Sequence, residues 1–198
     1  MRVGVPSEVK NHEYRVAITP AGVNELTRHG HDVLVQAGAG TGSSITDAEF
    51  EAAGAKIVSS RDDVWENAEM ILKVKEPIAI EYDSMQPGQV LFTYLHLAAS
   101  RDCTRALLDR KVTGIAYETV QLSNGALPLL APMSEVAGRL APQVGAYHLM
   151  RQGGGRGTLM GGVSGVYAAK VVVIGAGAAG LLAARVLPGN GIAAFESG

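Results

Sequence analysis

VVVIGAGAAG, at residues 171–180, decides the fold of the second half of this chain. Three valines and an isoleucine lead directly into the pattern Gly175-x-Gly177-x-x-Gly180, and a helix-forming stretch follows at residues 181–187. A buried strand, a tight glycine turn and a helix N-terminus in this order are the usual cradle for the pyrophosphate of a dinucleotide. The stretch therefore predicts a Rossmann-type nucleotide-binding turn.

Each position of this turn has its own expected role. Gly175 permits the tight turn, Gly177 lets the backbone approach a phosphate, and Gly180 lets the helix pack closely on the strand. The backbone N–H groups of Ala178 and Ala179 would then point at the anion, supported by the helix dipole. A glycine turn with a purely structural role is the alternative interpretation.

The residue that would bind the ribose is expected about 20 residues further on, at the end of the next strand. Residues 192–195 are the candidate strand, and Glu196 follows them. A carboxylate at this position favours NAD over NADP, although the last residues of a chain are often frayed. A dinucleotide fold normally needs about 100 further residues after the turn, so the sequence predicts an incomplete second sheet.

The first part of the chain alternates between strand and helix patterns. Its helices have clear start signals: Thr19-Pro20 reads as an N-cap with proline at the first helical position, and Thr46 with Glu49 resembles a capping box. Such alternation predicts an α/β fold with a parallel sheet and helices on both faces. We expect strands at 2–6, 32–36, 70–74, 90–95 and 112–117, and helices at 20–29, 47–53, 60–68 and 100–110.

The amino-acid composition of the chain changes near residue 125. Residues 126–132 are apolar and contain prolines, residues 134–151 predict one long helix, and residues 153–165 form a glycine-rich loop. We therefore expect a boundary between two lobes at 125–135, with the long helix as the connector.

Composition excludes several classes of function. The 17 basic and 19 acidic residues give a net charge of −2 without a basic cluster, so we expect no nucleic-acid partner. No apolar run reaches the roughly 18 residues of a membrane span, and residues 1–10 lack a secretory signal, so a cytoplasmic location is expected. The single cysteine, Cys103, predicts no internal disulfide and is interpreted as a spare thiol. No His, Cys or Asp spacing predicts a metal site.

Three polar residues stand at the ends of predicted elements. Arg15 precedes the first helix, where a guanidinium could hold a carboxylate in bidentate fashion, or form a surface salt bridge. Lys75 follows the strand at 70–74, at the end where open α/β sheets place ligands, although an edge lysine is the alternative. His96 follows the apolar run 90–95 and could exchange a proton with a keto oxygen, or be a structural histidine.

The surroundings of His96 refine this expectation. Leu95 and Leu97 flank it, so we expect it to lie away from a solvated face, and Tyr94 shares its face by the two-residue period of a strand. Two cations and an imidazole on the loops of one lobe, with a nucleotide turn in the other, suit a small carboxylate with an adjacent carbonyl.

Five segments resemble the L-alanine dehydrogenase family, and the resemblance runs from residue 1 to about residue 187. The five segments are VGVPSEVKNHEYRVAITPAGV at 3–23, KVKEP at 73–77, FTYLHLA at 92–98, LPLLAPMSEVAGRLA at 127–141 and VVVIGAGAAG at 171–180. The transhydrogenase NAD-binding component shares the opening segment and the glycine turn, but not the segments at 92–98 and 127–141.

The resemblance implies a reversible, NAD-linked oxidative deamination of L-alanine to pyruvate and ammonia. It also implies two Rossmann-like lobes and a homohexamer. Residues 1–128 then form the substrate-binding lobe, and residues 129–198 form the connecting helix and the first βαβ unit of the NAD-binding lobe.

Several residues match the family's functional positions. Arg15 and Lys75 match those that hold the substrate carboxylate and carbonyl, His96 matches the catalytic acid/base, and Tyr94 and Met133 match neighbours that line the pocket. On the cofactor side, the matching residues are Ser134, Gly175, Gly177, Ala178, Ala179 and Gly180.

The end of the chain departs from the family pattern. The family's ribose-binding aspartate falls in register with Gly198, and its catalytic aspartate and its C-terminal return into the first lobe lie beyond that residue. We therefore expect a truncated chain with little or no dehydrogenase activity of its own. The transhydrogenase component and a non-catalytic binding or assembly fragment are the alternatives.

Overall fold

The computed structural model describes residues 1–169, 173–174 and 194–195. The chain divides into two compact units, residues 1–120 and residues 121–198. The predicted nucleotide turn, Gly175, Gly177, Ala178, Ala179 and Gly180, lies outside the described residues, as does Glu196.

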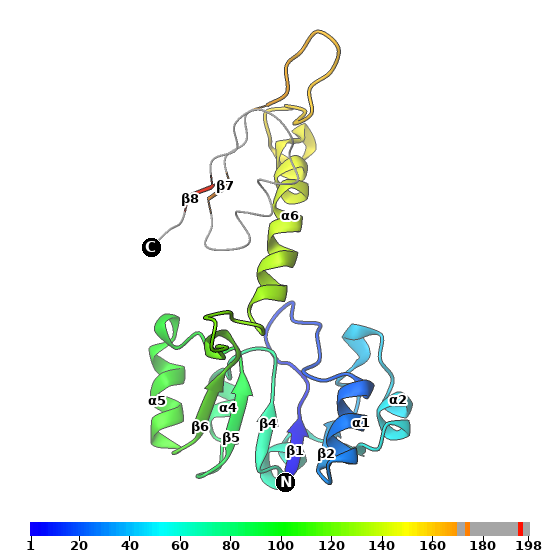
Figure 1. Ribbon diagram of the computed structural model, residues 1–198, viewed down its shortest axis with the longest axis vertical. Coiled ribbons are helices and arrows are strands. Elements are labelled where there is room, and N and C mark those ends of the chain that lie inside the picture. Colours follow the sequence, from blue (N-terminus) through cyan, green and yellow to red (C-terminus); the bar gives the residue numbers. More distant parts are fainter. Residues whose placement is uncertain (170–172, 175–193, 196–198) are drawn as a thin grey trace. The chain divides into compact units, whose positions relative to one another are not determined.

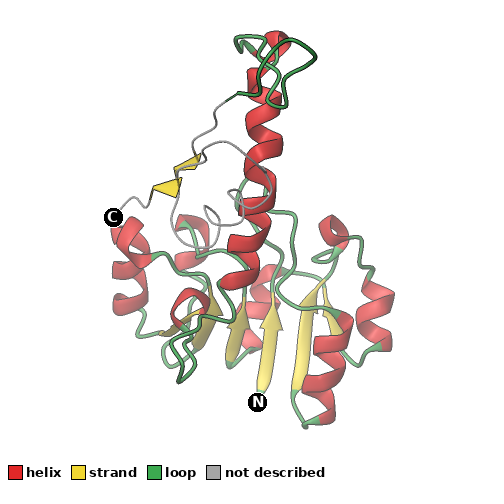
Figure 2. Ribbon diagram, turned by 45° about the horizontal axis from the view of Figure 1, so that its top comes forward, coloured by secondary structure: helices red, strands yellow, loops and turns green. Residues whose placement is uncertain are grey.

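The first unit is built on a six-stranded sheet with the order β3-β2-β1-β4-β5-β6, and all neighbouring strands are parallel (Figures 1 and 2). From β1 the chain builds outward through β2 and β3, and then returns to place β4, β5 and β6 on the other side. The predicted parallel α/β fold is confirmed. The strands are β1 (Arg2–Val5), β2 (Asp32–Gln36), β3 (Lys56–Val58), β4 (Met70–Leu72), β5 (Val90–Thr93) and β6 (Thr113–Ala116).

The helices begin where their caps predict. The Thr19 side chain accepts a hydrogen bond from the backbone N–H of Gly22, and Thr46 and Glu49 form a reciprocal capping box. The sequence interpretation missed the short elements β3 and α4. The first unit holds α1 (Pro20–Arg28), α2 (Asp47–Ala52), α3 (Arg61–Asn67), α4 (Ala79–Tyr82) and α5 (Arg101–Asp109), with 3₁₀ turns η1 (Thr41–Ser43), η2 (Leu97–Ala99) and η3 (Tyr117–Thr119).

The core of this unit lies on both faces of the sheet, because successive strand residues point to opposite sides. On one face, Val5 packs in a cluster with Phe50 of α2. On the other, Ile71 packs with Trp65 of α3 and Leu107 of α5. Helices therefore cover both faces, as the alternating pattern predicts.

Gly4 allows a close approach between α3 and the sheet. A Cβ atom built there would lie 2.7 Å from both Ala68 Cβ and Val64 Cγ1. Gly4→Ala is therefore expected to lower the free energy of unfolding by about 1–3 kcal/mol through overpacking. Urea unfolding followed by the fluorescence of Trp65 measures this loss. Gly145→Ala, with no atom within 4 Å of its added Cβ, should leave that transition at the same urea concentration or higher; equal midpoints for both variants would contradict the packing argument.

The second unit contains a long helix, α6 (Ala131–Leu149), followed by the 3₁₀ turn η4 (Arg151–Gly153). The helix begins three residues earlier than predicted, because Pro132 lies in its first turn, where no backbone N–H is needed. The strands β7 (Val173–Ile174) and β8 (Ala194–Phe195) pair in parallel. Both fall within strands that the sequence predicts. Within the described part of the chain, no helix is long and apolar enough to cross a membrane.

Candidate functional site

Three loops of the first unit carry the predicted polar residues to one edge of the sheet. Arg15 lies in the loop after β1, Lys75 follows the end of β4, and His96 follows the end of β5. These three strands are neighbours and parallel, so their carboxyl ends share an edge. The order of the strands reverses between β1 and β4, which is the point where open α/β sheets bind ligands.

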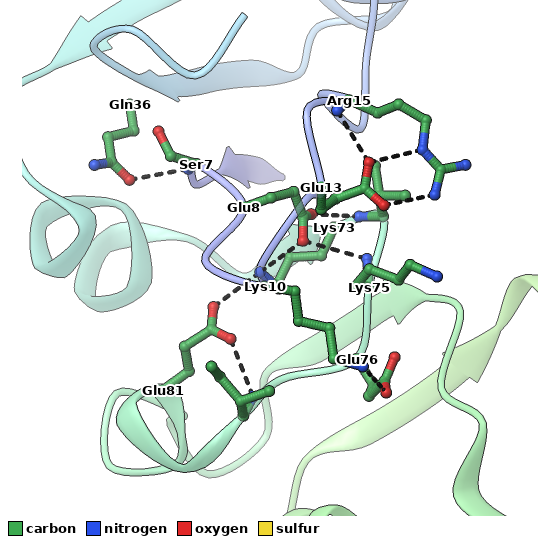
Figure 3. Close-up of polar contacts among 12 residues, drawn as sticks. Ser7, Glu8, Lys10, Glu13, Arg15, Gln36, Lys73, Lys75, Glu76 and Glu81 are labelled. Atoms are coloured by element: carbon green, nitrogen blue, oxygen red, sulfur yellow. Dashed lines mark hydrogen bonds and ion pairs between the residues drawn. The ribbon is translucent and has the colours of Figure 1, made fainter. Parts of the chain in front are cut away.

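Arg15 is engaged in a bidentate contact with Glu13. Its Nε and Nη2 atoms donate to the two carboxylate oxygens at 2.8 and 2.6 Å, and its backbone N–H donates to Oε1 at 3.0 Å (Figure 3). The hydrogen bonds from the Arg15 side chain lower the pKa of Glu13, and the charge of Lys75 adds to this effect. Arg15 thus forms a salt bridge here, and its side chain is still 43% exposed.

A buried ion cluster lies directly behind Lys75. Lys73 Nζ lies 2.8 Å from Glu81 Oε1 and 3.3 Å from Glu8 Oε2. The Glu8 carboxylate also accepts the backbone N–H groups of Val74, at 2.6 Å, and Lys75, at 3.3 Å (Figure 3). Burial raises the pKa of Glu8, against the charge of Lys73. The cluster therefore fixes the loop after β1 to the segment that carries Lys75.

The sequence interpretation missed this cluster. The available signal was a lysine inside the apolar run MILKV at residues 70–74, since a fully buried lysine almost always has a charged partner. Its partner Glu8 is 65 residues away in the sequence. No local pattern links the two positions.

His96 has a left-handed backbone, with φ 46° and ψ 40°. The Glu118 carboxylate accepts the backbone N–H groups of Leu95, at 3.1 Å, and of His96, at 2.7 Å. The imidazole Nδ1 lies 3.3 Å from Glu76 Oε2, and the ring stacks beside Tyr94 with 6.0 Å between centroids. Sequence reasoning identified neither Glu76 nor Glu118.

The expectation that His96 lies away from solvent is wrong, because its side chain is 46% exposed. Leu95 is buried but Leu97 is exposed. β5 ends at Thr93, and the left-handed turn at His96 then directs the chain into η2. The Tyr94 ring lies beside the imidazole through this turn rather than through strand alternation.

Glu76 connects the histidine to a further cation. Its carboxylate accepts a hydrogen bond from Lys10 Nζ (Figure 3). The other carboxylate oxygen contacts His96. Ion pairs therefore link several carboxylates and cations at this end of the sheet. The cations that are not buried can bind a small carboxylate at this edge, and the imidazole can exchange a proton. The cations are Lys10, Arg15, Lys73 and Lys75, and the carboxylates are Glu8, Glu13, Glu76 and Glu81.

Three further residues of the sequence analysis lie in helices. Met133 and Ser134 lie in the first turn of α6, in the second unit. Cys103 is buried in the first turn of α5, and burial raises the pKa of its thiol to about 11. Among the residues that the structure describes, no group of three His, Cys, Asp or Glu side chains could hold a metal ion.

A cleft of about 830 Å³ lies at the opposite edge of the same sheet, beside the amino ends of β1, β2 and β3. Arg2, His31, Asp32 and Lys56 are among its lining residues. Arg15, Lys75 and His96 are not part of this lining, so the cleft is separate from the candidate site.

Comparisons with known proteins identify the family. The family descriptions "Alanine dehydrogenase/PNT, N-terminal domain" and "Alanine dehydrogenase/PNT, C-terminal domain" match residues 4–137 and 141–194. The alanine dehydrogenase of Mycobacterium tuberculosis is 71% identical over 96% of this chain and 52% of its own length. That of Bilophila wadsworthia is 60% identical over 96% of the chain and 50% of its own length.

Solved structures agree with this relationship. A structure of L-alanine dehydrogenase superimposes with a TM-score of 0.84 at 52% identity, covering 94% of this chain and 51% of the other. A transhydrogenase from Sinorhizobium meliloti gives 0.75 at 32% identity, covering 99% and 56%. The chain spans about half the length of the curated relatives it matches. It belongs to the alanine dehydrogenase/PNT family.

Proposed function

We propose that this chain carries the substrate-binding half of an NAD-dependent alanine dehydrogenase site, which converts L-alanine reversibly to pyruvate and ammonia. The observation that carries the proposal is the placement of Arg15, Lys75 and His96 at the adjacent carboxyl ends of β1, β4 and β5. The identity of 52% to a solved alanine dehydrogenase, against 32% to a solved transhydrogenase, favours this reaction over hydride exchange between nucleotides.

In this proposal Arg15 and Lys75 bind the substrate. The Arg15 guanidinium holds the carboxylate, and the Lys75 ammonium polarises the neighbouring carbonyl. His96 relays protons while water adds to the imine of the substrate and ammonia leaves. Tyr94 and Met133 line the substrate pocket. Most of the rate enhancement then comes from positioning and electrostatics.

We assign the cofactor to residues 129–198, and the substrate to residues 1–128 with Met133 as an added contact. β7 ends directly before the glycine pattern and pairs in parallel with β8, which fits the frame of a mononucleotide-binding unit. NAD bound by these residues would supply the hydride acceptor for the substrate Cα. Ser134 would contact the cofactor, Glu196 would accept from the ribose, and the pyrophosphate would rest on Gly175, Gly177, Ala178, Ala179 and Gly180. We further propose that the protein forms a homohexamer and lies in the cytoplasm. Analytical sedimentation tests the number of subunits.

A chimeric protein tests whether these residues support the reaction when a relative supplies the rest of the sequence. Residues 1–187 of this chain would replace the aligned part of the Mycobacterium tuberculosis relative, to which they are closely similar. We expect the chimera to reduce NAD with L-alanine. Failure of the folded chimera to do so, or hydride exchange between NAD and NADP in its place, would overturn the proposed reaction.

Glu13 competes with a carboxylate ligand for Arg15, since it already occupies two N–H groups of the guanidinium. Glu13→Ala should therefore tighten the binding of pyruvate to the 198-residue chain by about two- to fivefold, the range expected for a partly exposed ion pair. Calorimetric titration measures the change, with Glu51→Ala on the exposed side of α2 as the control. A weaker affinity would instead mean that Glu13 orients Arg15 for its ligand.

A further inference from the structure

Glu76 stands between a cation and the imidazole of His96. One carboxylate oxygen accepts a hydrogen bond from Lys10 Nζ, and the other lies 3.3 Å from His96 Nδ1. The Glu76 side chain is only 12% exposed. It directly follows Lys75, so the same segment after β4 carries the ammonium and the carboxylate.

The charge state of Glu76 makes it a hydrogen-bond acceptor. Burial opposes its ionisation, but the hydrogen bond and the positive charge of Lys10 outweigh this effect and lower the pKa of Glu76. An ionised carboxylate has no proton to donate. A neutral imidazole facing it at Nδ1 must therefore supply the proton of this contact.

The backbone of His96 is fixed separately. Non-glycine residues rarely adopt a left-handed conformation, and here the Glu118 carboxylate holds it by accepting the N–H groups of Leu95 and His96. The Tyr94 ring stacks against the imidazole. Glu118 thus fixes the backbone from which the His96 side chain projects, and Tyr94 restricts the orientation of the imidazole ring. Glu76 faces one of the two ring nitrogens.

We propose that Glu76 is a positioning residue, which holds His96 in the Nδ1–H tautomer and leaves Nε2 as the atom that exchanges protons with a ligand. The hydrogen-bond partner of one ring nitrogen decides which of the two nitrogens carries the proton. A carboxylate at Nδ1 can only accept, so it favours the tautomer with the proton on Nδ1. Lys10 keeps Glu76 charged and in place. The consequence for catalysis rests on the proposed function, but the tautomer itself does not.

Nitrogen NMR of the 198-residue chain tests this inference without substrate or cofactor. The chain is labelled with ¹⁵N-histidine and recorded at about pH 9, where a free imidazole is neutral. The loss of one signal in His96→Gln assigns His96 among the five histidines. The two-bond ¹H–¹⁵N pattern then distinguishes Nδ1–H from Nε2–H.

We expect His96 to be predominantly Nδ1–H in the unaltered chain, and Glu76→Ala to shift it by several-fold toward Nε2–H. Glu66→Ala, which removes an exposed carboxylate of α3, should leave the pattern unchanged. A predominantly Nε2–H ring in the unaltered chain would overturn the inference even if Glu76→Ala did not fold. So would an unchanged tautomer in folded Glu76→Ala. Because no reaction is involved, these results are separate from failure of the proposed function.

Discussion

Lys73→Met is expected to destabilise the first unit by about 3–5 kcal/mol at neutral pH, because it leaves two buried carboxylates without their cation. Lys73 and Glu81 are fully buried, and Glu8 is nearly so. Such a loss is a large fraction of the roughly 5–15 kcal/mol by which a domain is stable. Urea unfolding followed by Trp65 fluorescence measures it.

The loss of stability in Lys73→Met is expected to depend on pH. Burial raises the pKa of Glu8 above its ordinary value of 4.5, so the folded chain binds this proton more readily than the unfolded chain. The contribution of Glu8 to stability is therefore complete below about pH 4.5 and is lost as the pH rises through the raised pKa. Without Lys73 that rise is larger, so the defect of Lys73→Met should shrink on acidification. A loss of stability that did not change with pH would mean that altered packing, and not uncompensated charge, causes it.

A matched variant separates charge from volume. Glu8→Gln and Glu81→Gln, added to Lys73→Met, remove the uncompensated charges at nearly constant size. The triple variant is expected to recover a substantial part of the stability at neutral pH, because buried ion pairs can often be replaced at little net cost. No recovery would mean that the hydrogen bonds that the Glu8 carboxylate accepts from the backbone N–H groups of Val74 and Lys75 provide most of the stability of the cluster.

In the chimera with the Mycobacterium tuberculosis relative, His96→Ala is expected to lower kcat for L-alanine oxidation by about 10²- to 10⁴-fold. That is the usual cost of losing a general acid/base. The KM for L-alanine should change much less, since Arg15 and Lys75 hold the carboxylate and carbonyl in the proposed site. Steady-state reduction of NAD provides both constants.

His29→Ala is the control for this variant, because His29 is an exposed histidine that follows α1. It should leave both constants within about twofold. A loss of less than about tenfold in His96→Ala would contradict the acid/base role. The remaining cations could then still bind substrate, but another group would have to move the proton.

Local patterns predicted much of the fold. The caps at Thr19 and Thr46 depend on hydrogen bonds within three residues, so the sequence alone identifies them. The short strand β3 and the four-residue α4 were missed because neither is long enough to show a period. The pairing of β1 with β4 depends on contacts between distant residues, yet strand–helix alternation was sufficient to predict a parallel sheet.

The candidate site was predictable only in part. Apolar runs followed by a polar residue located Lys75 and His96 beyond the ends of strands. Their carboxylate partners were not predictable, because Glu8 and Glu118 come from segments distant in sequence. The exposure of His96 was predicted wrongly for the same reason: Glu118, 22 residues away, accepts the backbone N–H of its left-handed turn.

The most direct test of the central claim is a titration of pyruvate into the 198-residue chain, followed by NMR at the side chains of Arg15, Lys75 and His96. If the three side chains form one site, all three signals shift along one saturable curve, and Lys75→Ala abolishes the shifts at the other two. Shifts that follow separate curves, or no shifts at any of the three, would contradict the account.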